Sequence, residues 1–111
     1  MAGALSLNTY KTIRSDVTTG ITTVYTAPNG VASIHLFSVV SNISAGIATI
    51  TVYHDRSGDS YELIKNAKIP ATDALNPIGG SLVLEVGDKI LVEGTANNVM
   101  KFTLSILESA K

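Results

Sequence analysis

Hydrophobic and polar residues alternate in short runs along this chain, and turn residues interrupt the runs about every ten positions. Alternation with a period of two places successive side chains on opposite faces of a β-strand. The segments with strand character lie at residues 3–14, 21–25, 31–40, 47–54, 60–65, 82–86, 89–93 and 100–106. No segment repeats apolar residues with the spacing of three and four that is typical of a helix. We therefore predict an all-β protein with about eight strands.

Glycine, proline, asparagine and aspartate mark the turns between these segments. The turns are expected at residues 15–20, 28–30, 42–46, 55–59, 79–80, 87–88 and 94–98. Many short strands at this spacing predict an antiparallel β-sandwich. The pattern leaves an immunoglobulin-like and a jelly-roll sandwich open, because it does not report which strands pair. The size of the chain favours the immunoglobulin-like form.

The segment at residues 31–40 is apolar on both of its faces. Strict alternation places Ala32, Ile34, Leu36 and Val40 on one face and Val31, Phe37 and Val39 on the other. Apolar residues on both faces are typical of a strand at the centre of a sheet that is covered on both sides. We expect residues 31–40 to be such a strand.

Residues 1–20 allow two interpretations. Leu5, Leu7, Tyr10 and Ile13 alternate loosely with polar residues. The segment is either the first strand of the sandwich or an N-terminal arm that pairs with a sheet edge of a neighbouring subunit. We predict that these four residues form a protein interface in the second case and part of the core in the first.

Composition narrows the classes of function. The 111 residues suit a single domain, at residues 1–111, and 45% of them are hydrophobic, which is enough for a core. The sequence has no cysteine, which excludes disulfides and thiolate metal ligands. Eight basic and nine acidic residues are scattered and give a net charge of -1. Without a basic patch, nucleic-acid binding is not expected, and the small net charge permits copies to associate.

Targeting signals and membrane segments are not expected from the sequence. The N-terminal residues lack the positive charge and the apolar stretch of a secretory signal. No window approaches the ~18 consecutive apolar residues of a membrane span. We expect the protein to be made in the cytoplasm and to bind no membrane.

The residues that most often carry chemistry are few and separated. His35 and His54 lie in different predicted strands, which favours ordinary packed or surface residues over metal ligands. Asp55 and Asp59 flank a predicted hairpin turn, and an aspartate-capped turn is favoured over a calcium loop, which needs more oxygen ligands. No metal and no cofactor is predicted.

A carboxylate pair at Glu85 and Asp88 could serve a glycosidase, but a charged turn is favoured there. A sugar cleft needs aromatic residues, and the chain has four tyrosines, two phenylalanines and no tryptophan. The same shortage makes a carbohydrate-binding module a lesser alternative. The tyrosines, expected at the edge of the core or at an interface, are Tyr10, Tyr25, Tyr53 and Tyr61. No nucleophile elbow or phosphate loop occurs. We therefore predict no catalytic residue and no enzymatic activity.

Five segments occur in an order that is similar to a known family. They are residues 10–13 (YKTI), 22–30 (TTVYTAPNG), 39–43 (VVSNI), 82–88 (LVLEVGD) and 104–108 (LSILE). In this order they resemble small virion structural proteins of tailed bacteriophages, in particular those of cyanophages and related marine phages. The likeness covers nearly the whole chain.

The resemblance implies a capsid decoration or cement protein. Such a protein binds the major capsid protein and stabilises the assembled shell by mass action. The resemblance also implies a homo-oligomer, with a trimer favoured, on the capsid surface of the virion. A tail, neck, baseplate or fiber-attachment component is the alternative that the same resemblance allows.

Overall fold

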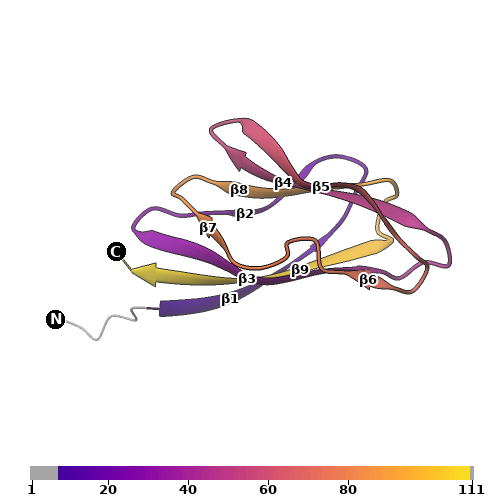
Figure 1. The fold of residues 1–111 in the computed structure, drawn as a ribbon, viewed down its shortest axis with the longest axis horizontal. Helices are drawn as coiled ribbons and strands as arrows, with labels where there is room; N and C mark the ends of the chain where they lie inside the picture. Colours follow the sequence, from indigo (N-terminus) through magenta and orange to yellow (C-terminus); the bar gives the residue numbers. More distant parts are fainter. Residues whose placement is uncertain (1–7, 111) are drawn as a thin grey trace.

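The computed structural model describes residues 8–110, which form nine strands and no helix (Figure 1). The strands are β1 (Asn8–Asp16), β2 (Thr22–Thr26), β3 (Val31–Asn42), β4 (Ala48–Arg56), β5 (Asp59–Ile69), β6 (Ala74–Leu75), β7 (Leu82–Leu84), β8 (Lys89–Gly94) and β9 (Met100–Ala110). The prediction of an all-β fold is confirmed.

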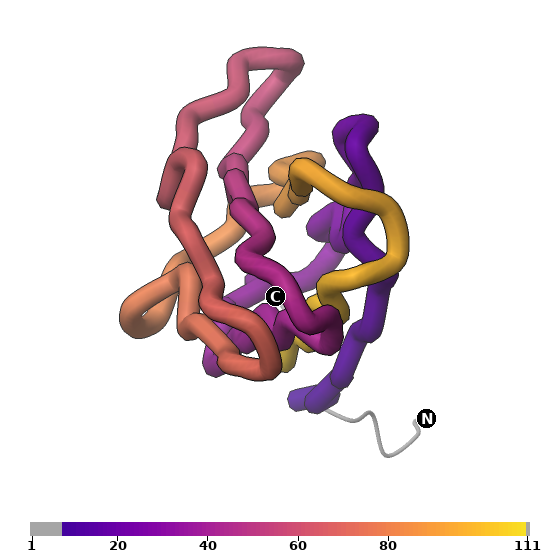
Figure 2. The backbone as a smooth tube through the Cα atoms, turned by 90° about the vertical axis from the view of Figure 1, so that its right-hand side faces the viewer, coloured from indigo at the N-terminus to yellow at the C-terminus, as the bar shows by residue number. Residues whose placement is uncertain are grey.

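Two antiparallel sheets pack face to face. The five-stranded sheet has the order β1-β9-β3-β6, with β7 also paired to β3, and the four-stranded sheet has the order β2-β8-β4-β5. Figure 1 shows the two layers one above the other, and Figure 2 shows them from one end, with the hairpin of β4 and β5 reaching upward. The predicted β-sandwich is therefore confirmed.

The strand order is that of a jelly roll. β6 and β7 pair with different parts of β3, so together they take the place of one strand. The chain then pairs its first strand with its last, its second with the next to last, and so on to the central hairpin. An immunoglobulin domain instead has its first two strands side by side in one sheet. The jelly-roll alternative is correct, and the preference for an immunoglobulin-like form was wrong because chain size does not report strand order.

The core lies between the sheets and follows the alternation expected from the sequence. Met100, Phe102, Leu104 and Ile106 of β9 all point inward and are fully buried. They face the buried side chains of the four-stranded sheet. The main contributors from that sheet are Ile50, Val52, Ile90 and Val92.

β1 is an edge strand of the five-stranded sheet and pairs with β9 along its whole length. Of the predicted interface residues, Tyr10 points away from the core and Ile13 packs against it. Leu5 and Leu7 lie outside the described residues. The interface role of these four residues stays a prediction.

β3 departs from strict alternation at one point. Its register with β9 shifts between His35 and Phe37, so Leu36 is the extra residue of a β-bulge. One extra residue moves every later side chain to the opposite face. Val40 therefore lies in the core while Ile34 lies on the outer face. Alternation alone had placed both on the same face.

Candidate functional site

The inner face of β3 carries polar side chains, although it borders the core. The buried polar residues of this strand are Ser33, His35, Ser38 and Asn42. The apolar residues around them consequently point out of the sandwich. The outer face of the five-stranded sheet is thus unusually hydrophobic for a surface of the molecule.

Four apolar residues form a row across this outer face. Tyr10 of β1 pairs with Leu107 of β9, and Leu107 pairs with Ile34 of β3. Ile34 in turn pairs with Val83 of β7. The two ends of the row are the most exposed, with Tyr10 at 71% and Val83 at 61%. We call these four residues the apolar row.

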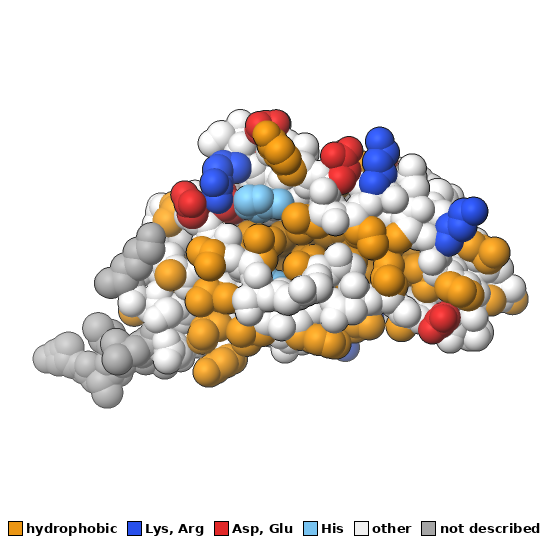
Figure 3. Space-filling view, in the orientation of Figure 1, with side chains coloured by type: hydrophobic (Ala, Val, Ile, Leu, Met, Phe, Trp, Pro, Cys, Tyr) orange, Lys and Arg blue, Asp and Glu red, His pale blue; other side chains and the backbone are white. Residues whose placement is uncertain are grey.

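The bulge in β3 adds two large side chains beside the apolar row. Neighbouring residues of a regular strand point to opposite faces, but Leu36 and Phe37 are both exposed, at 42% and 49%. Figure 3 shows hydrophobic side chains along the lower side of the molecule, on the layer that carries β3 and β9 in Figure 1. We call the apolar row together with Leu36 and Phe37 the apolar face.

The prediction that residues 31–40 are covered on both sides is wrong for the single chain. β3 does lie inside its sheet, between β9 and the pair formed by β6 and β7. Its inner face meets the core, but no element within residues 8–110 covers its outer face. The sequence pattern of a doubly covered strand thus occurs on a strand with one open face.

The outer face of the four-stranded sheet has a different character. Its matching row runs from Thr23 through Leu91 and Tyr53 to Glu62. Leu91 is buried, and the Tyr53 hydroxyl donates a hydrogen bond of 2.7 Å to Glu93. The two outer faces of the sandwich therefore differ, one apolar and one polar.

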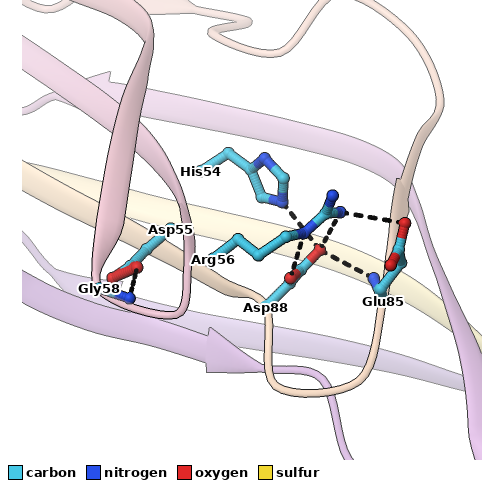
Figure 4. A network of polar contacts seen from close by, with 6 residues as sticks. All are labelled: His54, Asp55, Arg56, Gly58, Glu85 and Asp88. Carbon is cyan, nitrogen blue, oxygen red and sulfur yellow. Dashed lines mark hydrogen bonds and ion pairs between the residues drawn. The ribbon is translucent and has the colours of Figure 1, made fainter.

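The tip of the β4–β5 hairpin forms as the sequence predicts. Ser57 and Gly58 both have positive φ, at 56° and 85°, which is the conformation of a type I′ turn. The carboxylate of Asp55 accepts a hydrogen bond of 3.0 Å from the backbone N–H of Gly58 (Figure 4). The expected aspartate-capped turn is confirmed.

A polar cluster around Asp88 connects this hairpin to the turn between β7 and β8 (Figure 4). Arg56 donates from Nε at 2.9 Å and from a terminal nitrogen at 2.7 Å, and His54 Nε2 lies 2.9 Å away. The backbone N–H of Glu85 donates at 2.9 Å. The predicted charged turn forms, and the side chain of Asp88 in it is only 1% exposed. Hairpin residues that are distant in sequence cover it.

These contacts define what the Asp88 carboxylate can do. The hydrogen bonds from Arg56 are the main cause that holds the pKa of Asp88 well below its usual range, and His54 and the N–H of Glu85 act in the same direction against burial. The carboxylate stays ionised and its acceptor sites are occupied. The cluster therefore ties β4 to the β7–β8 turn and offers no free base to a substrate.

A second polar cluster lies between the sheets, near the ends of β1 and β9. The Tyr25 hydroxyl donates to Glu108 at 2.5 Å, and Lys11 Nζ lies 2.9 Å from the other carboxylate oxygen. Burial is the main cause that raises the pKa of Tyr25 to about 12, and the bond to Glu108 adds to it. Burial alone would raise the pKa of Glu108, but the hydrogen bonds from Tyr25 and Lys11 lower it overall. No local sequence pattern indicates this cluster, because its members come from three strands.

His35 is fully buried on the inner face of β3. Its Nδ1 lies 2.7 Å from the carbonyl oxygen of Gly80, so Nδ1 carries the proton and donates it. Within the described residues, its Nε2 has no hydrogen-bond partner. Burial lowers the pKa of His35, since a buried imidazolium loses its hydration. The folded protein consequently holds His35 neutral.

The buried His35 predicts a loss of stability in mild acid. The unfolded chain binds the proton below about pH 6.5 while the folded chain resists it. The free energy of unfolding should therefore fall as pH drops below about 6.5, by at most about 1.4 kcal/mol per pH unit. Urea unfolding of the wild type and of His35→Asn over about pH 5 to 8 measures this, and the variant should show the smaller slope. Equal slopes would contradict the prediction.

The two histidines do not meet. His35 lies in the core and His54 lies in the Asp88 cluster, as expected for packed residues. In the part of the chain that the structure describes, no three His, Cys, Asp or Glu side chains come together as metal ligands. A search of the same residues for a helix long and apolar enough to cross a membrane finds none.

Comparison with known proteins identifies a shared fold. No family model matches the chain, and no curated protein matches it either. A solved structure from Bacillus endospore appendages, described as forming a novel family of disulfide-linked pili, is similar over 100% of this chain and 99% of that chain. The TM-score is 0.53 and the sequence identity is 12%. At this identity the likeness shows the fold alone.

Proposed function

We propose that this chain is a non-enzymatic structural subunit that associates with other protein subunits through its apolar face. The observation that carries the proposal is the row of four apolar residues, flanked by two more at the bulge, on the open side of the five-stranded sheet. A contiguous exposed apolar patch is typical of a protein–protein contact. Two aromatic side chains, Tyr10 and Phe37, supply the anchors that such contacts favour.

The distribution of charge on this sheet supports the same proposal. The apolar face contains no charged residue. Arg14, Asp16 and Lys101 lie toward one end of the sheet, where Lys101 and Asp16 form an ion pair of 2.5 Å. An apolar centre with a polar margin is the usual composition of a protein interface.

The finer form of the proposal is a capsid decoration protein of a tailed bacteriophage. The ordered sequence segments that resemble virion proteins support it, and jelly rolls are frequent in capsid proteins. The partner would be the major capsid protein, and the site would be the capsid surface. As a component of the tail, neck or baseplate, the protein would bind through the same surface in an assembly of different symmetry. The trimer that the resemblance implies stays a prediction.

A subunit of a protein filament is a second candidate. The fold likeness to a protein of Bacillus endospore pili supports it. That protein is described as disulfide-linked, whereas these 111 residues contain no cysteine. A filament of this chain would consequently be held by non-covalent contacts.

Binding to empty phage capsids tests the proposed function. We expect the purified protein to co-sediment with the shells, at a copy number on the order of hundreds for a lattice site and about six or twelve for a ring at the neck or tail. Long particles formed by the protein alone would favour the filament. A protein that remains alone under all of these conditions would contradict a structural role.

The matched variants Phe37→Glu and Thr23→Glu identify the surface that binds. Phe37 lies on the apolar face, and Thr23 lies on the polar outer face of the other sheet. We expect Phe37→Glu to abolish association while Thr23→Glu leaves it unchanged. If Thr23→Glu abolishes association and Phe37→Glu does not, the contact lies on the outer face of the four-stranded sheet.

A further inference from the structure

We infer that the apolar face pairs with the same face of a second copy of this chain, about a two-fold axis through the middle of the apolar row. The inference deepens the proposed function, because it rests on the apolar face being a protein contact and names its first partner. Three features of the described residues carry it: the order of side chains in the row, the place of the bulge, and the size of the face.

The apolar row is complementary to itself when it is turned by 180°. A two-fold axis that lies in the interface plane, parallel to the strands and between Leu107 and Ile34, places each of them over the other residue in the second copy. The same rotation places Tyr10, at one end of the row, over Val83 at the other end. A large ring therefore meets a short branched side chain twice. Both of these end residues are more than half exposed in the single chain.

The bulge falls where the same rotation provides room for it. Phe37 pairs with Ser105, one row beyond the apolar row. The rotation exchanges β3 and β9 and keeps positions along the strands, so it places Phe37 over Ser105 of the second copy. Ser105 has a small side chain, so it leaves space for the Phe37 ring. The large residues of each copy thus oppose small residues of the other.

The outer surface of the sheet that carries the apolar face is large enough for a stable pair. β3 has 12 residues, which at ~3.3 Å per residue extend about 40 Å. β1, β9, β3 and β7, at ~4.8 Å between neighbours, give a width of about 19 Å. The product, roughly 750 Å², is close to the ~800 Å² that each partner buries in a standard interface.

Charge is compatible with the pair. Arg14, Asp16 and Lys101 lie toward one end of the sheet. The two-fold rotation places Lys101 over Ser41 and Asp16 over Ala74 of the second copy, so these charges face uncharged residues. The outer face of the four-stranded sheet stays available for a further partner. We therefore expect a pair in place of the trimer that the sequence resemblance implies.

Engineered cysteines test the pairing directly, because the native sequence has none. In Tyr10→Cys with Val83→Cys, the two sites of one chain lie three strand spacings apart, about 14 Å. A disulfide needs Cα atoms within about 7 Å, so no bridge can close within the chain. In the two-fold pair each cysteine faces the other type in the second copy. Mild oxidation should give a covalent dimer whose mass, on a non-reducing gel and by intact mass spectrometry, stops at two chains.

The matched control is Thr23→Cys with Glu62→Cys. These sites end the corresponding row on the other outer face, with the same number of strands between them. Tyr10→Cys alone is a second control, because the axis keeps the two Tyr10 positions apart. Dimer yield at least roughly tenfold above both controls is expected for a preformed pair, since a bound neighbour raises the effective concentration. A yield equal to the controls overturns the inference. A ladder of three or more chains also overturns it, since that is a head-to-tail contact.

The unmodified protein provides a second measurement. Leu107 lies beside the axis, so Leu107→Glu changes the contact at two places in each pair. Sedimentation should show a dimer for the wild type and self-association weaker by at least roughly a hundredfold for the variant. If the wild type is a monomer and Phe37→Glu abolishes its binding to capsids, the pairing is contradicted and the proposed function is supported. If the disulfide dimer forms but binds neither capsids nor further copies of the chain, the pairing is supported and the proposed function is contradicted.

Discussion

Replacing Phe102 by aspartate should leave the chain unfolded at room temperature. The Phe102 side chain is fully buried near the start of β9, and Phe102 pairs with Val40 of β3 and Ser15 of β1. An aspartate at this position would have to lose its hydration without a partner, at a cost of several kcal/mol. A domain of this size is stable by only about 5–15 kcal/mol. The milder change Phe102→Ala should lower the free energy of unfolding by about 3–5 kcal/mol.

Circular dichroism and urea unfolding measure both variants. The control is Thr103→Asp, at the next residue of the same strand, whose side chain points to the outer face and is only partly buried. We expect Thr103→Asp to change the free energy of unfolding by less than about 1 kcal/mol. A folded Phe102→Asp with a native spectrum would contradict the position of β9 in the core.

Replacing Asp88 by asparagine should remove about 2–3 kcal/mol from the free energy of unfolding at neutral pH. Loss of one partner from a buried ion pair typically costs about 3–5 kcal/mol, and half-exposure of the Arg56 side chain reduces this. The asparagine amide would also bring donor hydrogens toward Arg56 and His54, which themselves donate. We expect the β7–β8 turn to detach from β4 before the rest of the sandwich unfolds.

The same variant has a defined dependence on pH. The pKa of Asp88 is lowered by folding, so its stabilising effect is complete above the unfolded value, about pH 4, and is lost as pH falls toward the folded value. The difference in unfolding free energy between the wild type and Asp88→Asn should therefore shrink between about pH 4 and 2. The control is Asp59→Asn, at the exposed tip of the β4–β5 hairpin, which should lose little unfolding free energy at neutral pH. An undiminished difference at low pH would mean that Asp88 acts through its shape alone.

Local sequence patterns were sufficient to predict the position of a residue in the fold wherever that position depends on its neighbours in the chain. The alternation at residues 100–106 predicts the buried side of β9 because one side of that strand faces only the core. The hairpin turn at residues 55–59 follows from the positive φ that Gly58 adopts readily and from the capping carboxylate of Asp55. Strand propensity and turn chemistry are properties of short segments, so these strands and turns can be predicted from the sequence.

Contacts between distant segments could not be read in this way. Asp88 and Arg56 are separated by 32 residues, and Tyr25 and Glu108 by 83. Each pair meets only because the strand order brings two segments together. The alternation in residues 31–40 was misread because a bulge is set by the pairing of β3 with β9. The polar residues Ser33, His35 and Ser38 in that segment were the available signal that its apolar side faces outward.

The sequence by itself determined that this protein is an all-β sandwich with a buried β9, capped turns and no cysteine chemistry. Those properties depend on side-chain type and on a period of two residues. Only the tertiary structure decided the jelly-roll order, the burial of Asp88 and the exposure of the apolar face. The physical reason is that each of these depends on which strands pair and in which register. A shift of one residue in that register exchanges the inner and outer faces of a strand.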